Sequence, residues 1–416
     1  MSWRGSLFPQ AVIVPLCKAN SKPREKGNPD MFRFLAAALI AVVMSFSAES
    51  VAQPLQMVSE SRVRTYYVAA DEVDWDYAPG GVNKMMGMKF DGYSKVFVER
   101  GPHRIGSIYR KALYREYTDE TFAHLKPRPA EWESSGILGP ILRAEVGDTI
   151  RVVFKNNATH PYSIHPHGVF YKKDSEGALY EDGTSGSDKG DDAVPPGKTH
   201  VYTWEVPERA GPGPNDPSSI VWLYHSHAYE MRDVHSGLVG AIIISRRGAA
   251  DAAGKPKDVD REFVCLFMLF DENQSWYLDY NIQTYTGDPK GVNKGEFIPV
   301  DTNGNLAPAG NGFSVANGKF AINGYIYGTG PVMTMKKGER VRWYLVGLGE
   351  GFSLHTPHWH GNVVLQDGKR TDVVSLMQAQ MVTVDMVPDD PGTWMFHCHL
   401  DDHMEAGMMA FYKVEP

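Results

Sequence analysis

Most histidines of this 416-residue chain lie in four short clusters, and no other feature constrains the fold as strongly. The clusters hold ten of the 15 histidines. The first two read His165-Pro166-His167-Gly168 and His225-Ser226-His227, and the last two are residues 355–361 (HTPHWHG) and 397–408 (HCHLDDHMEAGM). A single His-x-His pair is weak evidence, because two unrelated histidines often fall at that spacing. Four such pairs indicate metal binding.

The spacing of each pair suits a strand. Residues i and i+2 of a strand point to the same face and lie about 6–7 Å apart along the chain. Each pair therefore aims two imidazoles at one ion or at two neighbouring ions. Neutral imidazole binds zinc, copper, iron and nickel, so the pairs alone leave the metal open.

The fourth cluster narrows the choice of metal. One thiolate, two imidazoles and a thioether form the ligand set of a blue copper electron-transfer centre. His355, Cys398, His403 and Met408 supply that set. A zinc site has no need of the thioether, so we predict copper.

The residues beside Cys398 predict a second site. On a strand, Cys398 points to one face while His397 and His399 point to the other. A copper ion on Cys398 would be joined to the neighbouring site by a few covalent bonds. Such a path carries electrons from a substrate-facing copper to a buried cluster.

The fold class follows from short strand-like runs. Residues 62–69, 148–154, 199–206, 240–245, 262–270 and 340–346 are β-branched or aromatic and end at Gly, Pro, Asp or Asn. Long helical periodicity is scarce. An all-β protein built from sandwich domains is expected.

An internal repeat predicts two domains. Residues 145–154 (EVGDTIRVVF) resemble 336–345 (KKGERVRWYL), and 222–227 (WLYHSH) resemble 394–399 (WMFHCH). Two copies of one sandwich explain both likenesses. We expect domain 1 over residues 53–247, a linker over 248–260 and domain 2 over 261–416.

The order and spacing of the four clusters resemble the copper signature of the multicopper oxidases. Residues 137–148, 176–184, 220–228, 236–244, 270–282 and 322–328 are also similar to ceruloplasmin. The resemblance runs through most of residues 62–416. It implies two cupredoxin-like Greek-key domains, where ceruloplasmin has six.

The resemblance also implies four copper ions per chain. The type 1 copper takes His355, Cys398, His403 and Met408, and the type 2 copper takes His165 and His358. The two type 3 coppers take six histidines, which are His167, His225, His227, His360, His397 and His399. Cys398, His397, His399 and Asp402 are the residues expected to take part in catalysis.

Domain 1 is expected to carry no blue copper. Tyr162, Ser226 and Met231 stand where the second copy has His355, Cys398 and His403. The type 2 and type 3 ligands divide evenly between the two copies, so their cluster must form at a boundary between domains. Six domains surround a threefold axis in the ring-shaped relatives, which predicts a homotrimer with inter-chain clusters. One cluster within each chain is the alternative, since short linkers favour contact between sequential domains.

The resemblance implies an oxidase that takes single electrons from a small reducing substrate and reduces O2 to water. Laccase-like oxidation of phenols and aromatic amines is our first expectation. Oxidation of Fe(II) is the alternative, since Asp402 precedes His403 and carboxylates suit a hard cation. Glu350 lies one residue early, with Gly351 at the position expected for an acidic residue.

Two other classes compete with the oxidase. A copper nitrite reductase lacks the type 3 histidines, and eight cluster histidines argue against it. A copper carrier needs one exposed site rather than twelve ligands. Met85, Met86 and Met88 suit Cu(I) capture, although a flexible packing loop is the commoner meaning of such a run.

The remaining expectations concern compartment and partners. Residues 1–52 read as a leader whose start is Met31 and whose residues 31–52 form a secretory signal peptide, so we expect a periplasmic or extracellular protein without stable membrane insertion. A net charge of -8 and the lack of a basic stripe exclude nucleic acid as a partner. The resemblance to ceruloplasmin implies a calcium site at Asp191 and Asp192, although we interpret this acidic pair as a solvated loop. No disulfide is expected, and Cys265 is a buried structural thiol.

Overall fold

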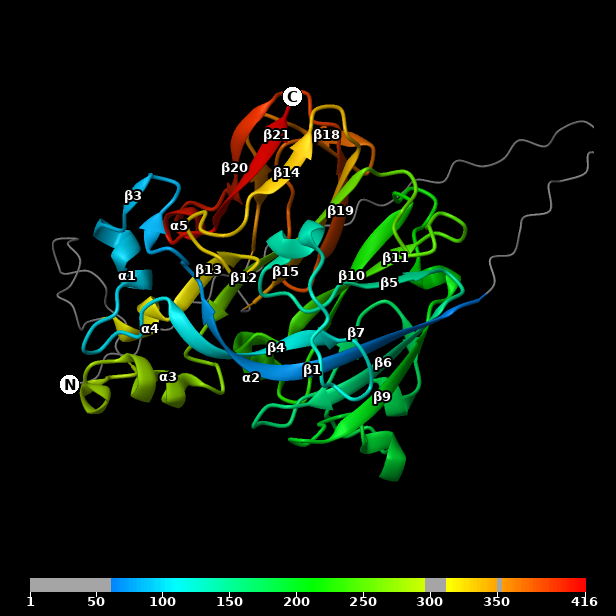
Figure 1. The fold of residues 1–416 in the computed structure, drawn as a ribbon, viewed down its shortest axis with the longest axis horizontal. Coiled ribbons are helices and arrows are strands. Elements are labelled where there is room, and N and C mark those ends of the chain that lie inside the picture. The colour runs from blue at the N-terminus through cyan, green and yellow to red at the C-terminus, as the bar shows by residue number, and fades with distance from the viewer. Residues whose placement is uncertain (1–60, 296–311, 350–353) are drawn as a thin grey trace, which may run out of the picture. The chain divides into compact units, whose positions relative to one another are not determined.

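The predicted strand runs all form strands in the computed structural model, which describes residues 61–295, 312–349 and 354–416 (Figure 1). Their limits differ from the predicted ones by a few residues, and β1 (Val63–Asp76) extends furthest. Its second part pairs with β4 (Ile108–Tyr117), a strand that the sequence analysis did not predict. The predicted leader over residues 1–52 lies outside the described residues.

The first half of the chain forms two sheets. The five-stranded sheet has the order β4, β1, β6 (Thr149–Asn156), β9 (Thr199–Glu205), β8 (Phe170–Tyr171). The four-stranded sheet has the order β5 (Leu142–Glu145), β11 (Val239–Ser245), β10 (Ser219–His225), β7 (His165–Pro166). Apolar residues from both sheets share one buried core. The two sheets therefore form a sandwich.

The second half repeats this arrangement. The six-stranded sheet has the order β13 (Gly318–Ile322), β12 (Arg261–Asp271), β15 (Val341–Leu348), β19 (Met381–Met386), β17 (Val364–Gln366), β18 (Lys369–Thr371). The four-stranded sheet has the order β14 (Met333–Lys336), β21 (Met409–Glu415), β20 (Gly392–Cys398), β16 (Pro357–Trp359). A second core lies between these sheets, so the expected all-β class with two sandwiches is confirmed.

Strand pairing shows the internal repeat directly. β1 runs parallel to β6, which is antiparallel to β9; β12 runs parallel to β15, which is antiparallel to β19. The histidine strands match as well, because His165 lies opposite His225 and His358 lies opposite His397. The repeat inferred from the sequence is thus present in the strand order, while the domain limits at 247 and 261 stay a prediction.

A third core joins the two halves. Strand β12 is buried on both faces: Phe263, Cys265 and Phe267 face the second sandwich, while Val264 and Leu266 face the shared core. Side chains of β10 and β11 also enter this core. Burial on both faces explains the continuous apolar run EFVCLFMLF, because such a strand does not alternate between apolar and polar residues.

A buried ion pair lies beside the shared core. Lys111 of β4 pairs with Glu272, which follows β12, and both side chains are fully buried. Tyr77 donates a hydrogen bond to the same carboxylate at 2.5 Å. Removing one partner of such a pair is strongly destabilising, because it leaves a buried charge without compensation. The pair therefore ties the two halves together at fixed positions.

Helices are short and few in the described residues. They are α1 (Lys95–Val98), α2 (Glu230–Ser236), α3 (Leu278–Tyr285), α4 (Phe313–Ala316) and α5 (Asp401–Glu405). None of the helices described here has the length and apolarity needed to cross a bilayer. α5 matters most for function, because it presents His403 next to the end of β20.

Candidate metal centre

A cysteine and two histidines converge at the end of β20. His355, Cys398 and His403 place their ligand atoms within 4.8 Å of one another, and all three are buried. Cys398 Sγ lies 3.6 Å from His403 Nδ1, and the two imidazole rings are 5.2 Å apart. The structure therefore brings together three of the four residues predicted to hold a blue copper, from segments 43 positions apart in the chain.

His355 carries the clearest sign that a ligand belongs here. Its side chain is 0% exposed, and neither ring nitrogen has a hydrogen-bond partner among the described residues. A buried polar atom without a partner costs free energy. A metal ion at this point would satisfy one of these two nitrogens, and with the thiolate of Cys398 nearby the side chains fit a soft transition metal.

The local electrostatics keep the imidazoles neutral. Burial is the main cause that lowers the pKa of His355 to about 4, and the charge of neighbouring His403 contributes to the same shift. Burial also lowers the pKa of His403. Neutral imidazole is the form that binds a metal, so both side chains are ready to bind at neutral pH.

Met408 is held next to these ligands by the backbone. It is fully buried, its carbonyl accepts the Cys398 N–H at 3.1 Å, and its N–H donates to His403 O at 2.9 Å. Gly407, just before it, has a φ of 114°, and a Cβ there would lie 2.9 Å from the Tyr327 ring. Only glycine fits this turn.

Thr356 is a residue that the sequence analysis missed. Its N–H points at Cys398 Sγ at 3.4 Å, and its hydroxyl accepts the His399 N–H at 3.0 Å. Hydrogen bonds to a ligating sulfur tune the redox potential of such a site. No side-chain pattern marks this role, because the donor to sulfur is a backbone N–H.

At the equivalent place in the first half, two of the three residues have hydrogen-bond partners and the third is exposed. The Tyr162 hydroxyl lies 3.1 Å from the Tyr277 hydroxyl. The Ser226 hydroxyl donates to Asp233 at 2.7 Å, and Met231 is 63% exposed. These contacts support the prediction that domain 1 carries no blue copper.

Four histidines of the first half gather on one side of β10 and β7. The rings of His165, His167, His225 and His227 have neighbouring centroids 5.2 to 5.7 Å apart. His167 Nε2 lies 3.2 Å from His225 Nε2. We call these four residues the first histidine set.

Four histidines of the second half form an equivalent group. His358, His360, His397 and His399 have neighbouring ring centroids 4.8 to 5.4 Å apart. His360 Nε2 lies 3.1 Å from His397 Nε2, and His399 is exposed. We call them the second histidine set.

Backbone carbonyls fix the tautomers of two histidines in each set. His165 Nδ1 donates to Glu176 O at 2.6 Å, and His358 Nδ1 donates to Asp372 O at 2.9 Å. His225 and His397 donate in the same way to the carbonyl of the following residue. Each Nε2 therefore keeps its lone pair, which is how ligating histidines are held in metal sites.

A contact between a glycine and a tryptophan explains why the His-x-His-Gly motif and the Trp-containing His-x-His motif occur together in each half. Gly168 and Gly361, which end the two His-x-His-Gly motifs, have φ values of 77° and 75°. A Cβ on either one would meet the ring of Trp222 or Trp394 at 2.2 and 2.6 Å. Each tryptophan begins the other motif of its own half, so the close contact sets the position of one histidine pair against the other.

The two histidine sets do not meet within one chain. In residues 61–295, 312–349 and 354–416, no ring contact joins a member of the first set to a member of the second. Each set alone offers four imidazoles, half of the eight predicted for the type 2 and type 3 coppers. The structure thus brings the predicted residues together as two half-sites.

The metal-free chain should lose stability in mild acid. Burial lowers the pKa of His167, His355 and His397 to about 4 from 6.5, so the unfolded chain takes up protons first as the pH falls. This stability is complete above pH 6.5 and decreases towards pH 4, by about 1.4 kcal/mol per pKa unit and group. Melting temperatures of the apoprotein measured from pH 7 to 5 should therefore fall. A flat profile would contradict these pKa values, and exposed His124→Gln, as a control, should leave the slope unchanged.

Three exposed carboxylates flank His403 along the helix α5. Asp401, Asp402 and Glu405 all lie on α5 and are exposed, and the His403 N–H donates to Asp402 Oδ1 at 3.0 Å. The same two acids, Glu405 and Asp402, contribute after burial to the raised pKa of Tyr93. Glu350 and Gly351 lie outside the described residues.

The acidic pair Asp191–Asp192 is buried, which corrects our interpretation of a solvated loop. The two residues are 0% and 3% exposed, because the loop folds back on β9 and Gly177 donates its N–H to Asp191 at 2.7 Å. Lys189 lies 3.2 Å from Asp192 and 2.7 Å from Asp182. A lysine ammonium thus balances part of the acidic charge.

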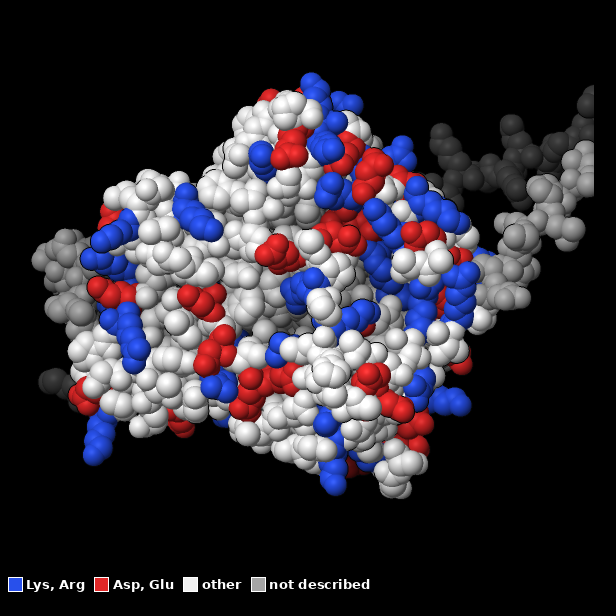
Figure 2. All heavy atoms as spheres, viewed as in Figure 1, with Lys and Arg blue, Asp and Glu red and all other residues white. Residues whose placement is uncertain are grey.

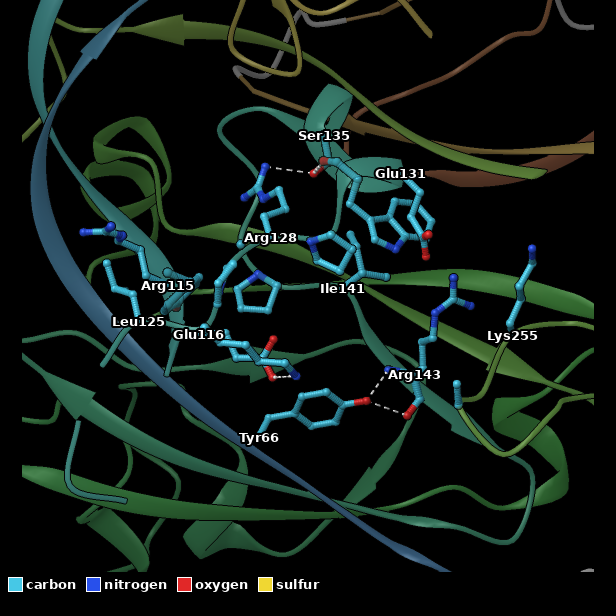
Figure 3. A pocket seen from close by; sticks show the side chains of 18 of the residues that line it. Tyr66, Arg115, Glu116, Leu125, Arg128, Glu131, Ser135, Ile141, Arg143 and Lys255 are labelled. Atoms are coloured by element: carbon cyan, nitrogen blue, oxygen red, sulfur yellow. Dashed lines mark hydrogen bonds and ion pairs between the residues drawn. The ribbon is translucent and has the colours of Figure 1, made fainter. Parts of the chain in front are cut away.

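A cavity in the first half of the chain is lined by no histidine (Figure 3). It measures about 720 Å³ and none of its lining residues is a predicted metal ligand. Tyr66 bonds to the backbone of Arg143, and Arg128 is held by Ser135 (Figure 3). On the face drawn in Figure 2, basic and acidic side chains are interspersed, without a continuous basic stripe.

Comparisons with known proteins agree with this geometry. Two sequence models of the multicopper oxidase family match residues 126–249 and 305–416. Human Ferroxidase HEPHL1 is 46% identical over 355 residues, which cover 85% of this chain and 29% of that protein. Mouse hephaestin is 43% identical, covering 86% and 30%, and rat ceruloplasmin is 38% identical, covering 85% and 32%. The chain thus spans about a third of the length of these curated relatives.

Solved structures show the same fold. A crystal structure of a multicopper oxidase matches with a TM-score of 0.50 and 22% identity, over 85% of this chain and 90% of the other. The blue copper oxidase from Nitrosomonas europaea matches with a TM-score of 0.51 and 17% identity, over 85% and 86%. These matches confirm the predicted cupredoxin-like fold.

Proposed function

This chain belongs to the multicopper oxidase family, and we propose that it oxidises Fe(II) with O2 as the electron acceptor. One observation of the structure carries the choice of iron. Three exposed carboxylates, Asp401, Asp402 and Glu405, share the short helix α5 with His403, the predicted copper ligand nearest to solvent. Carboxylate oxygens suit a hard divalent cation, whereas a phenol needs an apolar slot.

The relatives support the same choice. HEPHL1 is named a ferroxidase and is similar over most of this chain. The comparisons therefore favour the Fe(II) alternative over the laccase-like oxidation that we expected first. The nitrite reductase and copper carrier alternatives lack comparable support, since both histidine sets are present.

The residues divide into a site for electron entry and a site for O2. We assign His355, Cys398, His403 and Met408 to the type 1 copper, and the two histidine sets to the type 2 and type 3 coppers. Copper bound at these residues would supply the one-electron redox chemistry and the four-electron reduction of O2 to water. Cys398 and His397 are neighbours on β20, so a single peptide unit separates the two sites.

We infer a homotrimer from the two half-sites. His399 is exposed, and His227 is only partly buried, although both are predicted ligands. A second copy of the chain that presents its first set to the second set would complete eight ligands and cover these side chains. Such a contact uses different surfaces on the two copies, and repeating it gives a ring when three copies complete the rotation.

Replacing Asp402 should separate iron from organic substrates. In Asp402→Asn, the amide oxygen still accepts the His403 N–H, while the negative charge is lost. We expect kcat/KM for Fe(II) to fall by roughly tenfold, which corresponds to about 1.4 kcal/mol. The measurement compares Fe(II) with a substituted phenol under the same conditions, and the phenol value should change little.

The control for this experiment is Asp367→Asn, which removes an exposed carboxylate from the turn between β17 and β18. It should affect neither substrate. An equal loss for both substrates in Asp402→Asn would mean that Asp402 acts on the copper site as a whole. A loss confined to the phenol would reject iron as the substrate.

Two further proposals concern calcium and compartment. A calcium ion at Asp191 and Asp192 would have to displace the Lys189 ammonium, and Asp191 Oδ1, which has no hydrogen-bond partner among the described residues, is the atom free to bind it. A higher melting temperature in calcium than in magnesium would support calcium binding at this site.

Export to the periplasm or the extracellular space follows from the predicted signal peptide over residues 31–52.

A further inference from the structure

Three methionines lie on a small hairpin, and two of them are exposed to solvent rather than packed in a core. The hairpin joins β2 (Val82–Asn83) to β3 (Met88–Lys89), and its turn holds Met85 and Met86. Met86 is 68% exposed and Met88 is 47% exposed. Packing against apolar neighbours is the usual role of methionine, and it does not explain two thioethers in water.

The hairpin borders a cavity that is rich in methionine. The cavity measures about 640 Å³, and four of its 15 lining residues are Met85, Met86, Met395 and Met409. The whole chain has 18 methionines in 416 residues, so fewer than one would be expected in a set of this size. The thioethers come from distant segments, namely the hairpin, β20 and β21.

His360 of the second histidine set lines the same cavity. Its N–H donates to Met395 O at 3.1 Å, and its Nε2 lies 3.1 Å from His397 Nε2. Met395 and His397 are two positions apart on β20, so both point to the same face. The cavity therefore leads from the exposed hairpin to the imidazoles.

The donor types identify the ion. Thioether sulfur is a soft, neutral ligand that selects Cu(I) over hard divalent ions. We propose that this cavity binds Cu(I) through its methionines and is the place where copper enters the second histidine set. The ion moves from thioether to imidazole as Cu(I), so no electron is exchanged and no proton is released from the methionines.

Neutral ligands suit a site of entry. A thiolate binds copper tightly and retains it, whereas a thioether needs no deprotonation and binds less strongly. The Nε2 atoms of His360 and His397, which lie 3.1 Å apart, are the next ligands along the cavity. This inference rests on copper as the cofactor and is independent of the substrate that the enzyme oxidises.

The test measures Cu(I) binding to the metal-free protein. Cys398→Ser serves as the background, so that the thiolate does not compete. Met85, Met86 and Met395 are each changed to Leu, which keeps the volume of the side chain. Competition with a coloured Cu(I) chelator should show binding weakened by roughly 10- to 100-fold, and X-ray absorption should show fewer sulfur neighbours around the bound ion.

The control variant changes Met231 and Met377 to Leu, which are 63% and 64% exposed and lie outside the cavity. It should bind Cu(I) as the background protein does. Should the triple variant fold poorly, the exposed Met86→Leu alone should still weaken binding measurably.

Two results would overturn the inference. One is equal Cu(I) affinity in the triple variant and the control, which would leave the methionines a packing role. The other is a site that prefers Mn(II) and depends on Glu405, a carboxylate of the same cavity, rather than on the thioethers. A protein that binds Cu(I) here yet fails to oxidise Fe(II) would reject only the proposed function.

Discussion

A His167→Ala chain and a His397→Ala chain, each inactive alone, should regain about one quarter of the wild-type activity when they assemble together in equal amounts. His167 belongs to the first histidine set and His397 to the second. In a ring, the first set of one chain meets the second set of the next chain. An interface is intact when its first histidine set comes from a His397→Ala chain and its second histidine set comes from a His167→Ala chain. Random assembly of equal amounts gives this pairing at one interface in four.

No activity should return if each chain forms its copper cluster from its own two histidine sets. Every chain of the mixture carries one damaged set, so an intra-chain cluster could not recover. Co-expression with two different tags would supply the mixed assembly, and O2 uptake is the measurement. The control pairs His360→Ala with His397→Ala, which damage the same set and should stay inactive. A fully active monomer, or no recovery in the first mixture, would reject the ring.

Cys398→Ser should abolish both the blue colour and turnover. A serine hydroxyl has the size of the thiol but is a poor ligand for copper, and the colour of a blue copper site comes from its thiolate. Changes in residues that only support a metal ligand cost 10- to 100-fold, so loss of the ligand itself should exceed about 100-fold. A visible spectrum and Fe(II)-dependent O2 uptake are the measurements.

Cys265→Ser is the matched control for this substitution. Cys265 is equally buried, but its sulfur contacts Met333 Sδ at 3.7 Å and no histidine. It should lower the melting temperature and leave the blue colour intact. Colour or O2 uptake that survives in Cys398→Ser would contradict the assignment of the type 1 site.

Local patterns were enough to predict six of the strands and the closeness of Cys398 and His403. Alternation in residues 148–154 gives β6, and the HCH motif with a following His and Met marks the site around Cys398. Both signals lie within a few residues of sequence. β4 escaped prediction because its apolar residues do not alternate and it is buried on both faces.

Long-range contacts could not be predicted in the same way. The burial of Asp191 and Asp192 depends on a loop that folds back on β9, and Thr356 acts on Cys398 through its backbone. Met86 and His360 line the same cavity, although more than 270 residues separate them in the sequence. None of these arrangements leaves a periodic signal in the sequence.

The choice of substrate also needed more than the motifs. Asp402 alone left phenols and Fe(II) both open. Asp401 and Glu405 are exposed on the same short helix and add two carboxylates to Asp402. The similarity to a named ferroxidase agrees with these acidic side chains.

A copper count on the purified assembly, taken with its visible spectrum, tests the central claim most directly. If the assembly has one thiolate copper site and one complete eight-histidine cluster for each chain, the protein should be blue and hold four copper ions per chain. A colourless, copper-saturated protein, or one that holds a single copper per chain, would contradict the account.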